Sequence, residues 1–541
     1  MRRINIQILI IVYSLLHQFA FSQQEKEPMK TGVFKPNWTS LEQYEVPDWF
    51  RDAKFGIWAH WGPQCQPEAG DWYGRNMYNE GSRQYNHHLE HYGHPSEVGF
   101  KDIIHQWKAD KWNPEQLLTL YKKAGARYFM AMGNHHDNFD LWNSDYQEWN
   151  SVALGPKRNI LEDWSQAAKK LQLPFGVSIH AAHAWQWYEA SQGADTTGAL
   201  AGIPYDGKLT KEDGKGTWWD GLDPQHLYAQ NHPLSKKSKE NGVTDDQWNW
   251  KNGASIPSKT YALNFYNRTV DMINKFNPDL LYFDDTALPL WPVSNVGLEI
   301  AAHYYNTNTS LHQGNMQAVL FGKILSEPQK ECLVWDVERG APDSIQEKPW
   351  QTCTCIGNWH YNQDVYDNDQ YKSATTVIQM LVDIVSKNGN LLLSIPIKGD
   401  GSLDDKEVKI LEGITQWMEV NSECIYETRP WLVYGEGPKV STSKPITAQG
   451  FNEGNGSAYT DKDIRFTEKG ETLYAIVMDW PKEDNKVLIT SLSTITNKAR
   501  KYTTVSLLGN TLKDFSFTTE GLWVSLPTTK RNNGPFVLKI K

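Results

Sequence analysis

The sequence predicts a (β/α)₈ barrel followed by an antiparallel β-sandwich. Up to about residue 421, apolar strands without in–out alternation take turns with amphipathic helices, which is typical of a buried parallel sheet. Polar residues follow these strands at their carboxyl ends, where a barrel gathers its active site, and the GxGxxG and Walker motifs of doubly wound sheets do not occur. From about residue 430 the chain changes to short strands separated by polar turns.

Periodicity places the elements of the barrel. We expect strands within 52–62, 127–136, 174–185, 278–285, 318–325, 332–338 and 391–396. Apolar residues at helical spacing indicate helices within 113–126, 163–173, 260–276, 374–389 and 404–421. The short runs 472–480, 486–492, 501–509, 522–527 and 536–541 read as strands of the sandwich.

The ends of these patterns predict the domain limits. Residues 1–22 have a basic start, an apolar stretch and small residues before a cleavage point, so we expect a signal peptide and a periplasmic or secreted protein rather than a membrane anchor. After residue 22 the sequence contains no run of about 18 apolar residues, so no membrane span is expected there. The barrel should cover 23–428 and the sandwich 429–541. The polar stretch 187–255 is expected to be an inserted loop region over the active face.

Composition narrows the class of ligand. The net charge is −10 and basic runs are short, as in SKKSK at 235–239, so nucleic acid is not an expected partner. Five cysteines, an odd number, give no disulfide framework. The 24 Trp and 25 Tyr residues are amphipathic plates that stack on the apolar faces of sugar rings, which favours a carbohydrate ligand.

The stretch ARYFMAMGNHHDNFDLW, residues 126–142, ends an apolar strand in two histidines and an aspartate. Together with His60, these residues would suit either a metal ion or a polar pocket for a hydroxyl-rich ligand. Neighbouring strand residues point to opposite faces, so His135 and His136 would bind one ion only if the strand has ended. The HExxH motif of zinc proteases is absent, and Cys353 and Cys355, two residues apart, have no CxxC pair to complete a zinc site. No metal and no other cofactor is therefore expected.

Two carboxylates end predicted strands. Glycoside hydrolysis requires one carboxylate to attack or to activate water and another to protonate the leaving oxygen. Asp284 ends the strand in 278–285, and Glu338 stands in WDVERG beside Arg339 and near Asp336. The alternatives are a capping or loop role for Asp284 and an ion pair with Arg339 for Glu338.

Seven blocks in order carry a family resemblance. They are KFGIWAHWG (54–62), GDWYGRNMY (70–78), GNHHDNFDLWNS (133–144), LLYFDD (280–285), VERG (337–340), PWQTCTCIGNWHY (349–361) and VDIVSKNGNLLLSIP (382–396). Over roughly residues 45–430 the chain resembles the α-L-fucosidases of glycoside hydrolase family 29. The resemblance implies a retaining exo-glycosidase with a (β/α)₈-like barrel, a C-terminal β-sandwich and no metal.

The resemblance also implies roles for particular residues. Asp284 would be the nucleophile, and Glu338 is the best candidate for the acid/base. The substrate-binding residues would be His60, Asp71, Trp72, His135, His136, Trp58 and Trp359. Trp58 and Trp359 would wall the pocket near the C6 methyl of fucose, and ordinary barrel packing is their alternative.

The chain departs from the family pattern at three positions. Gln351 stands where some relatives carry Glu, and Gln cannot act as acid/base. Asp285 stands where many relatives have Gly, which leaves a one-residue slip of the nucleophile open. Lys323 stands near an arginine of some relatives, and its role is not assigned.

The expected function is release of terminal α-L-fucose from oligosaccharides or polysaccharides by double displacement. The first alternative is an α-L-galactosidase of the same family acting on algal galactans, because L-galactose is L-fucose with a hydroxyl on C6 and an apolar pocket rejects a hydroxyl weakly. The second is a sugar-binding protein with a disabled site, suggested by Gln351. The oligomeric state, a homo-oligomer included, stays open.

Overall fold

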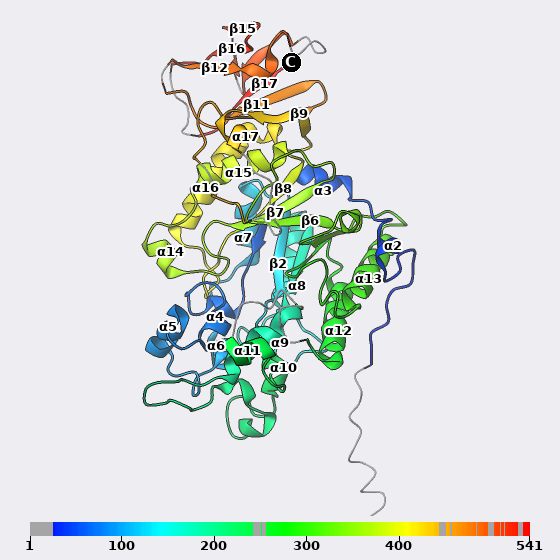
Figure 1. The fold of residues 1–541 in the computed structure, drawn as a ribbon, viewed down its shortest axis with the longest axis vertical. Helices are drawn as coiled ribbons and strands as arrows, with labels where there is room; N and C mark the ends of the chain where they lie inside the picture. The colour runs from blue at the N-terminus through cyan, green and yellow to red at the C-terminus, as the bar shows by residue number, and fades with distance from the viewer. Residues whose placement is uncertain are drawn as a thin grey trace, which may run out of the picture.

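Eight parallel strands form a closed barrel in the order β1 to β8, with β8 paired to β1 (Figure 1). In the computed structural model the strands are β1 (Phe55–Ala59), β2 (Tyr128–Asn134), β3 (Phe175–Ile179), β4 (Leu280–Phe283), β5 (Val319–Gly322), β6 (Val334–Glu338), β7 (Trp350–Cys355) and β8 (Gly389–Ser394). The predicted parallel barrel is thus confirmed.

The structure describes residues 25–541 except 242–249, 251–255, 443–450, 455–456, 483, 496–501, 509, 513 and 529–533. The expected signal peptide, residues 1–22, lies outside the described residues. Within the described part of the chain, no helix combines the length and the apolar character needed to cross a bilayer.

The barrel strands are buried along nearly their whole length, which explains their continuous apolar sequences. Close packing is visible where β1 meets β2. Gly56 pairs with Tyr128, and a Cβ atom on Gly56 would lie 2.2 Å from the Tyr128 ring. The tyrosine ring therefore takes the volume that a side chain at position 56 would need.

Helices cover much of the outside of the barrel (Figure 1), although no α-helix lies between β5 and β6 or between β6 and β7 in the described chain. The predicted helices correspond to α7 (Pro114–Lys123), α8 (Ile160–Lys170), α12 (Lys259–Phe276), α15 (Ala374–Ser386) and α16 (Asp405–Asn421). The start of α7 has two typical N-terminal signals: the Asn113 side chain accepts the N–H of Gln116, and Pro114 occupies the first turn.

Some elements of the barrel were not expected from the sequence, and one strand is shorter than predicted. Helix α13 (Val296–Leu311) and strand β7 were not among the expected elements. The strand expected within 174–185 ends at Ile179, because the chain turns at His180 into short helices η2 (Ala181–His183) and α9 (Ala184–Trp187).

The region 187–255 contains short helices in its described part: η3 (Tyr188–Gln192), η4 (Asp206–Lys208), η5 (Lys211–Gly214), α10 (Pro224–Tyr228) and α11 (Lys236–Asn241). It lies at the end of the molecule opposite the C-terminal sheets (Figure 1). The buried Asp206 carboxylate connects it to the barrel loops, since the Tyr78 hydroxyl donates to that carboxylate over 2.6 Å and Lys101 Nζ lies 3.1 Å from it. The predicted insertion is therefore tied down by buried polar contacts.

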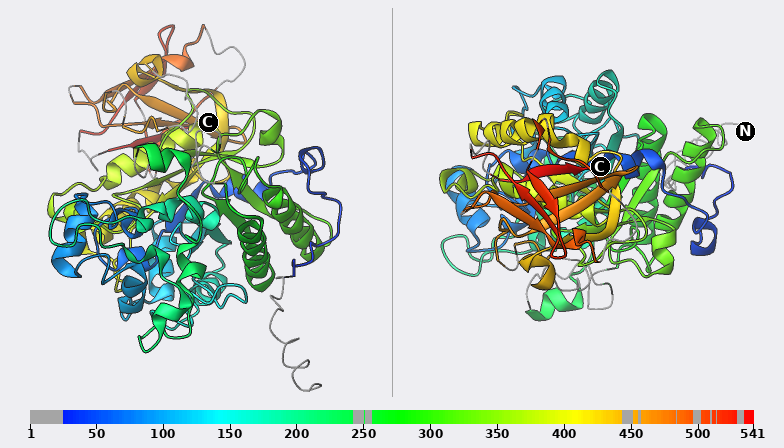
Figure 2. Two further views of the ribbon diagram at one scale, coloured as in Figure 1. Left: turned by 60° about the horizontal axis from the view of Figure 1, so that its bottom comes forward. Right: turned by 90° about the horizontal axis from the view of Figure 1, so that it is seen from above.

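The C-terminal strands form two antiparallel sheets (Figures 1 and 2). One sheet has the order β14-β13-β17-β11-β10-β9 and the other β12-β16-β15. Their bounds are β9 (Arg429–Glu436), β10 (Ile464–Lys469), β11 (Thr472–Val477), β12 (Lys486–Ile489), β13 (Val505–Leu507), β14 (Asn510–Thr511), β15 (Phe515–Phe517), β16 (Leu522–Ser525) and β17 (Phe536–Ile540). Side chains of both sheets, among them Phe466 and Val524, share one apolar core, as the predicted sandwich requires.

A buried ion network joins the barrel to these sheets. Asp383 of α15 contacts Arg465 Nε of β10 at 2.5 Å and Lys387 Nζ at 2.7 Å. Burial alone would raise the pKa of Asp383, but the two cations hold this pKa far below its usual range. All three side chains are buried, so the carboxylate between the two cations is what stabilises their burial.

We predict that Asp383→Asn lowers the free energy of unfolding by about 3 kcal/mol or more, because Arg465 and Lys387 would remain as buried, uncompensated cations. Because the folded-state pKa of Asp383 is depressed, its stabilisation is present above about pH 4 and is lost as pH falls further. Urea unfolding of both proteins at several pH values measures this. Asp405→Asn, which removes the exposed pair with Lys409, should cost much less. Equal losses in the two variants would contradict the account.

Candidate active site

A cavity of about 460 Å³ opens at the carboxyl-terminal end of the barrel. Eight of the nine predicted site residues line it: Trp58, His60, Asp71, Trp72, His135, Asp284, Glu338 and Trp359. His60 follows β1, His135 lies just beyond β2, Asp284 follows β4, and Glu338 is the last residue of β6. These side chains, distant in sequence, meet because the carboxyl ends of parallel barrel strands converge.

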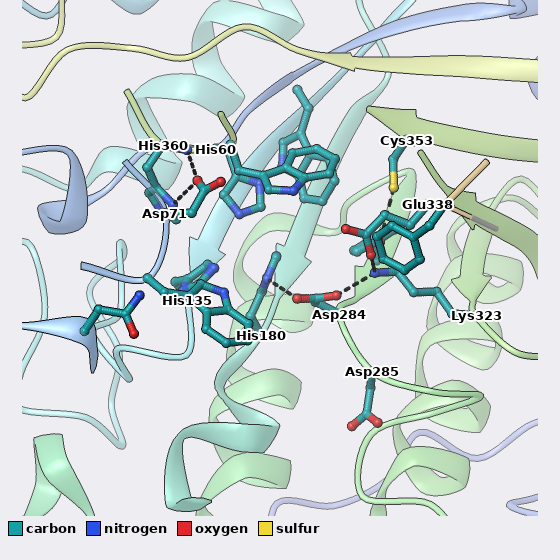
Figure 3. A pocket seen from close by; sticks show the side chains of 16 residues that line it. His60, Asp71, His135, His180, Asp284, Asp285, Lys323, Glu338, Cys353 and His360 are labelled. Carbon is teal, nitrogen blue, oxygen red and sulfur yellow. Dashed lines mark hydrogen bonds and ion pairs between the residues drawn. The ribbon is translucent and has the colours of Figure 1, made fainter. Parts of the chain in front are cut away.

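Asp284 is held at both carboxylate oxygens (Figure 3). Its Oδ1 lies 2.6 Å from Lys323 Nζ, and its Oδ2 lies 3.2 Å from His136 Nε2 and 3.3 Å from His180 Nδ1. Burial alone would raise the pKa of Asp284, but the Lys323 ammonium and the two imidazoles hold this pKa well below its usual range. Asp284 is therefore an anion at neutral pH.

Lys323, directly after β5, joins the two predicted catalytic carboxylates. Its Nζ donates to Asp284 Oδ1 and to Glu338 Oε2, each over 2.6 Å (Figure 3). Burial would lower the pKa of Lys323, but the two carboxylates raise it well above the usual value, so the ammonium stays charged. The two bonded carboxylate oxygens cannot lie farther apart than twice this bond length.

Four histidines crowd one side of the pocket (Figure 3): His60, His135, His180 and His360. Burial lowers the pKa of His60 and His135 well below the usual value and that of His180 to about 4. Gln64 Nε2 donates to His135 Nδ1 over 2.7 Å, so the neutral His135 ring carries its proton on Nε2. Neutral imidazoles can donate and accept, as the hydroxyls of a sugar require.

Some polar atoms of this wall have no protein partner. Among the described residues, His60 Nδ1, His360 Nε2 and Trp58 Nε1 are buried without a hydrogen bond. Buried polar groups in native proteins are almost always paired. These atoms are therefore candidates to bind hydroxyl groups of a ligand.

Asp71 ties together two loops of the rim. Its Oδ1 accepts the backbone N–H of His360 over 2.8 Å, and its Oδ2 accepts the side-chain amide of Asn358 over 3.2 Å.

Trp58 is buried and packs on Tyr282 and Trp359, with ring centroids 4.8 and 5.6 Å apart. The Trp58 and Trp359 rings line the pocket and also pack against each other, and their contact with the C6 methyl of fucose stays a prediction.

His136 does not line the pocket, unlike the other eight predicted residues. It is fully buried, its Nδ1 donates to the His180 carbonyl over 2.7 Å, and its Nε2 contacts Asp284. His136 thus lies where it can orient Asp284 and fix its charge. Direct contact with sugar hydroxyls stays a prediction for His60 and His135.

Asp285 and Gln351 have different surroundings from Asp284 and Glu338. The Asp285 carboxylate points away from Lys323 and accepts the backbone N–H groups of Thr286 and Leu290 (Figure 3). Gln351 is buried inside the barrel, where its Nε2 donates to Asp336 Oδ1 over 2.8 Å. Neither residue contacts Lys323 Nζ, so the pair of linked carboxylates is Asp284 and Glu338.

Eight pocket residues were not predicted as site residues: Asn76, His180, Tyr282, Asp285, Lys323, Cys353, His360 and Phe451. His180 has the same signal as His60, a histidine directly after a barrel strand. Tyr282 lies two residues before Asp284, and the period of two in a strand puts both on the inner side. Phe451 comes from beyond the barrel sequence and has no local signal.

A barrel with two linked carboxylates at the carboxyl ends of its strands has the groups that glycoside hydrolysis requires, and the histidines and tryptophans around them can contact a sugar. The sequence model of the family described as "Alpha-L-fucosidase" matches residues 21–423, and that of the "Alpha-L-fucosidase C-terminal domain" matches residues 458–541. The chain therefore belongs to the alpha-L-fucosidase family, and the predicted class, a fucosidase-type glycoside hydrolase, is confirmed.

Known relatives span nearly the whole chain. Human tissue alpha-L-fucosidase is 25% identical over 512 residues, which cover 91% of this chain and 88% of the human protein. The alpha-L-fucosidase of Branchiostoma floridae is 23% identical over 93% of both chains. The crystal structure of Thermotoga maritima alpha-fucosidase, 24% identical, matches the fold with a TM-score of 0.66 over 94% of this chain and all of that one.

We predict that activity does not depend on a metal ion. Among the described residues, two histidine groups have nitrogens close enough for one ion, His60–His135–His360 and His135–His136–His180. However, His135 Nδ1 accepts from Gln64, and both His136 nitrogens contact protein oxygens. Dialysis against EDTA should leave kcat/KM unchanged. A loss of activity that added zinc restores would show that one of these groups binds a catalytic metal.

Proposed function

We propose that this protein is a retaining, exo-acting α-L-fucosidase that releases terminal α-L-fucose by double displacement. The observation that carries the proposal is the Lys323 bridge. Because both of its bonds are 2.6 Å long, the linked oxygens of Asp284 and Glu338 lie within about 5 Å of each other. This upper limit is compatible with the spacing of about 5–5.5 Å at which one carboxylate attacks the sugar directly, and it is shorter than the gap of about 6.5–9.5 Å that inverting enzymes need for a water molecule.

In the first step Asp284 attacks C1 of the bound sugar and Glu338 donates a proton to the leaving oxygen. The contacts of Asp284 favour this role, since its depressed pKa keeps it ionised. The C1–oxygen bond breaks, an ester bond to Asp284 forms, and the leaving alcohol departs with the proton of Glu338. Glu338 is left as a carboxylate.

In the second step Glu338 takes a proton from water, whose oxygen attacks C1 and displaces Asp284. Each step removes one negative charge from one carboxylate and places it on the other. Lys323 contacts both, so its ammonium faces one carboxylate anion in the free enzyme and one in the glycosyl-enzyme. The buried cation is thus compensated throughout the cycle.

The pocket walls suit a deoxy sugar. Neutral His60 and His135 would bind ring hydroxyls, and the indole rings of Trp58 and Trp359 would face the C6 methyl group. The proposed substrates are oligosaccharides or polysaccharides with this sugar at a non-reducing end.

Gln351 is the residue that suggests the alternative function, a sugar-binding protein with a disabled active site. Since Gln351 is bonded to Asp336 and Tyr128 inside the barrel and does not line the pocket, its identity gives no reason to expect a missing acid/base. Asp284 and Glu338 line the cavity and are linked there by Lys323. This arrangement supports catalysis over mere sugar binding.

A screen of aryl glycosides tests the proposed function. We expect turnover of aryl α-L-fucoside with a kcat/KM about 10- to 100-fold above that of aryl α-L-galactoside, because an apolar pocket discriminates only moderately against an added hydroxyl. An oligosaccharide panel then defines the linkage. Preference for the galactoside would support the α-L-galactosidase alternative, and fucose binding by calorimetry without turnover would support the binding-protein alternative.

Replacement of Glu338 by alanine should separate substrates by their leaving groups. With a dinitrophenyl leaving group, which needs little protonation, kcat/KM should stay close to wild type. With a sugar leaving group, kcat/KM should fall about 100- to 10,000-fold. Asp336→Asn and Asp343→Asn serve as controls, because neither carboxylate lines the pocket. If either control shows the leaving-group dependence and Glu338→Ala does not, Glu338 is not the acid/base.

Replacement of Lys323 by methionine should change the pH profile. Without the ammonium, burial would raise the pKa of Asp284, so a higher pH would be needed to ionise it. The acid limb of kcat/KM should move up by about one to three pH units. Lys323→Arg keeps the charge and should shift the limb less. An unchanged acid limb in Lys323→Met would contradict the role assigned to the bridge.

A further inference from the structure

Phe451 is an exposed aromatic residue on the rim of the active-site cavity. It lines the cavity together with the barrel residues, although it lies after β9 and between the two segments that the family models match. Its side chain is 53% exposed. A large apolar ring that stays in contact with water beside a polar pocket is a candidate ligand contact.

The segment that carries Phe451 is bonded to the end of β6. The Phe451 N–H donates to the Glu338 carbonyl over 3.0 Å, and the Glu453 N–H donates to the Arg339 carbonyl over 2.9 Å. Between them, the Asn452 amide exchanges two hydrogen bonds of 3.0 Å with the backbone of Ala341. Phe451 is therefore held at the backbone of the proposed acid/base.

A part-buried ion pair also holds this segment. The Glu453 carboxylate contacts Lys372 Nζ at 2.5 Å and accepts the Thr354 hydroxyl, also over 2.5 Å. These contacts connect the segment to β7 and to the residues just before α15. Phe451 is therefore exposed in a segment that is held in place, because the residues after it are bonded to the barrel.

The backbone at Phe451 is strained. Its φ is 46°, in the left-handed region that bulky residues rarely adopt, and two other rim residues, Trp72 and Arg339, have φ of 59° and 49°. Such conformations cost free energy and persist where surrounding contacts impose them, often at ligand sites. Glycine or asparagine would adopt this φ more easily, so the aromatic ring needs a reason other than local geometry.

We propose that Phe451 is the platform of the leaving-group subsite. Glu338 protonates the leaving oxygen in the proposed reaction, so the leaving group lies on the Glu338 side of the scissile bond, where Phe451 is attached. A flat aromatic ring at this place would stack on the apolar face of a sugar ring or on an aryl ring. The subsite thus selects leaving groups that contain a ring, an inference that rests on the proposed function.

Two fucosides with leaving alcohols of similar acidity test this. Benzyl α-L-fucoside has a ring in its leaving group, and methyl α-L-fucoside has none. Phe451→Ala should lower kcat/KM for the benzyl fucoside about five- to tenfold and change that for the methyl fucoside less than about twofold. Phe451→Gly, which also relieves the left-handed backbone, should behave like Phe451→Ala, and Phe451→Tyr should keep most of the activity.

Leu432→Ala is a matched control, because Leu432 on β9 is 77% exposed and does not line the cavity. It should leave both substrates unaffected. If wild type hydrolyses both fucosides and Phe451→Ala loses the same factor on each, or nothing on either, the leaving-group platform is wrong while the proposed function stands. If wild type hydrolyses neither, the proposed function fails and this subsite fails with it.

Discussion

The buried ammonium of Lys323 between Asp284 and Glu338 is the interaction on which the active site depends. Two carboxylates and one ammonium, from the ends of three neighbouring strands, β4 to β6, meet in the cavity. Taking the buried ammonium away would leave Asp284 as an anion without its cation, and such an uncompensated charge is among the most costly defects in a protein. The three side chains come into contact because β4, β5 and β6 are neighbouring strands of the barrel. The histidines and tryptophans line the same cavity around them.

The fold was largely predictable because its main signals are local. Long buried strands such as 127–136 and helices such as α12 and α15 have strong periodicity and clear starts, so their positions follow from the sequence. β7 has no such signal, because Gln351 and Cys353 turn polar groups into the barrel and interrupt the apolar run. α13 is buried over most of its surface and so lacks a polar face that would mark it as an amphipathic helix.

Site residues that directly follow barrel strands were predictable from the sequence, whereas residues that reach the site through tertiary packing were not. The position at a strand end identified His60, His135, Asp284 and Glu338, all of which line the cavity. It could not show that His136 turns behind Asp284, since adjacent residues beyond a strand end take directions that only the tertiary structure sets. The contact of Lys323 with both carboxylates, and the approach of Phe451 from beyond the barrel, are long-range contacts that no local pattern encodes.

The central claim is that Asp284 becomes covalently bonded to the sugar. Incubation of the active enzyme with 2-deoxy-2-fluoro-L-fucosyl fluoride slows the second step and should trap the glycosyl-enzyme. Mass spectrometry of the peptides should then find one fluorofucosyl group, on the peptide that contains LLYFDD, and fragmentation should place it on Asp284 rather than Asp285. An adduct on another residue, or no adduct in an enzyme that hydrolyses fucosides, would contradict the account.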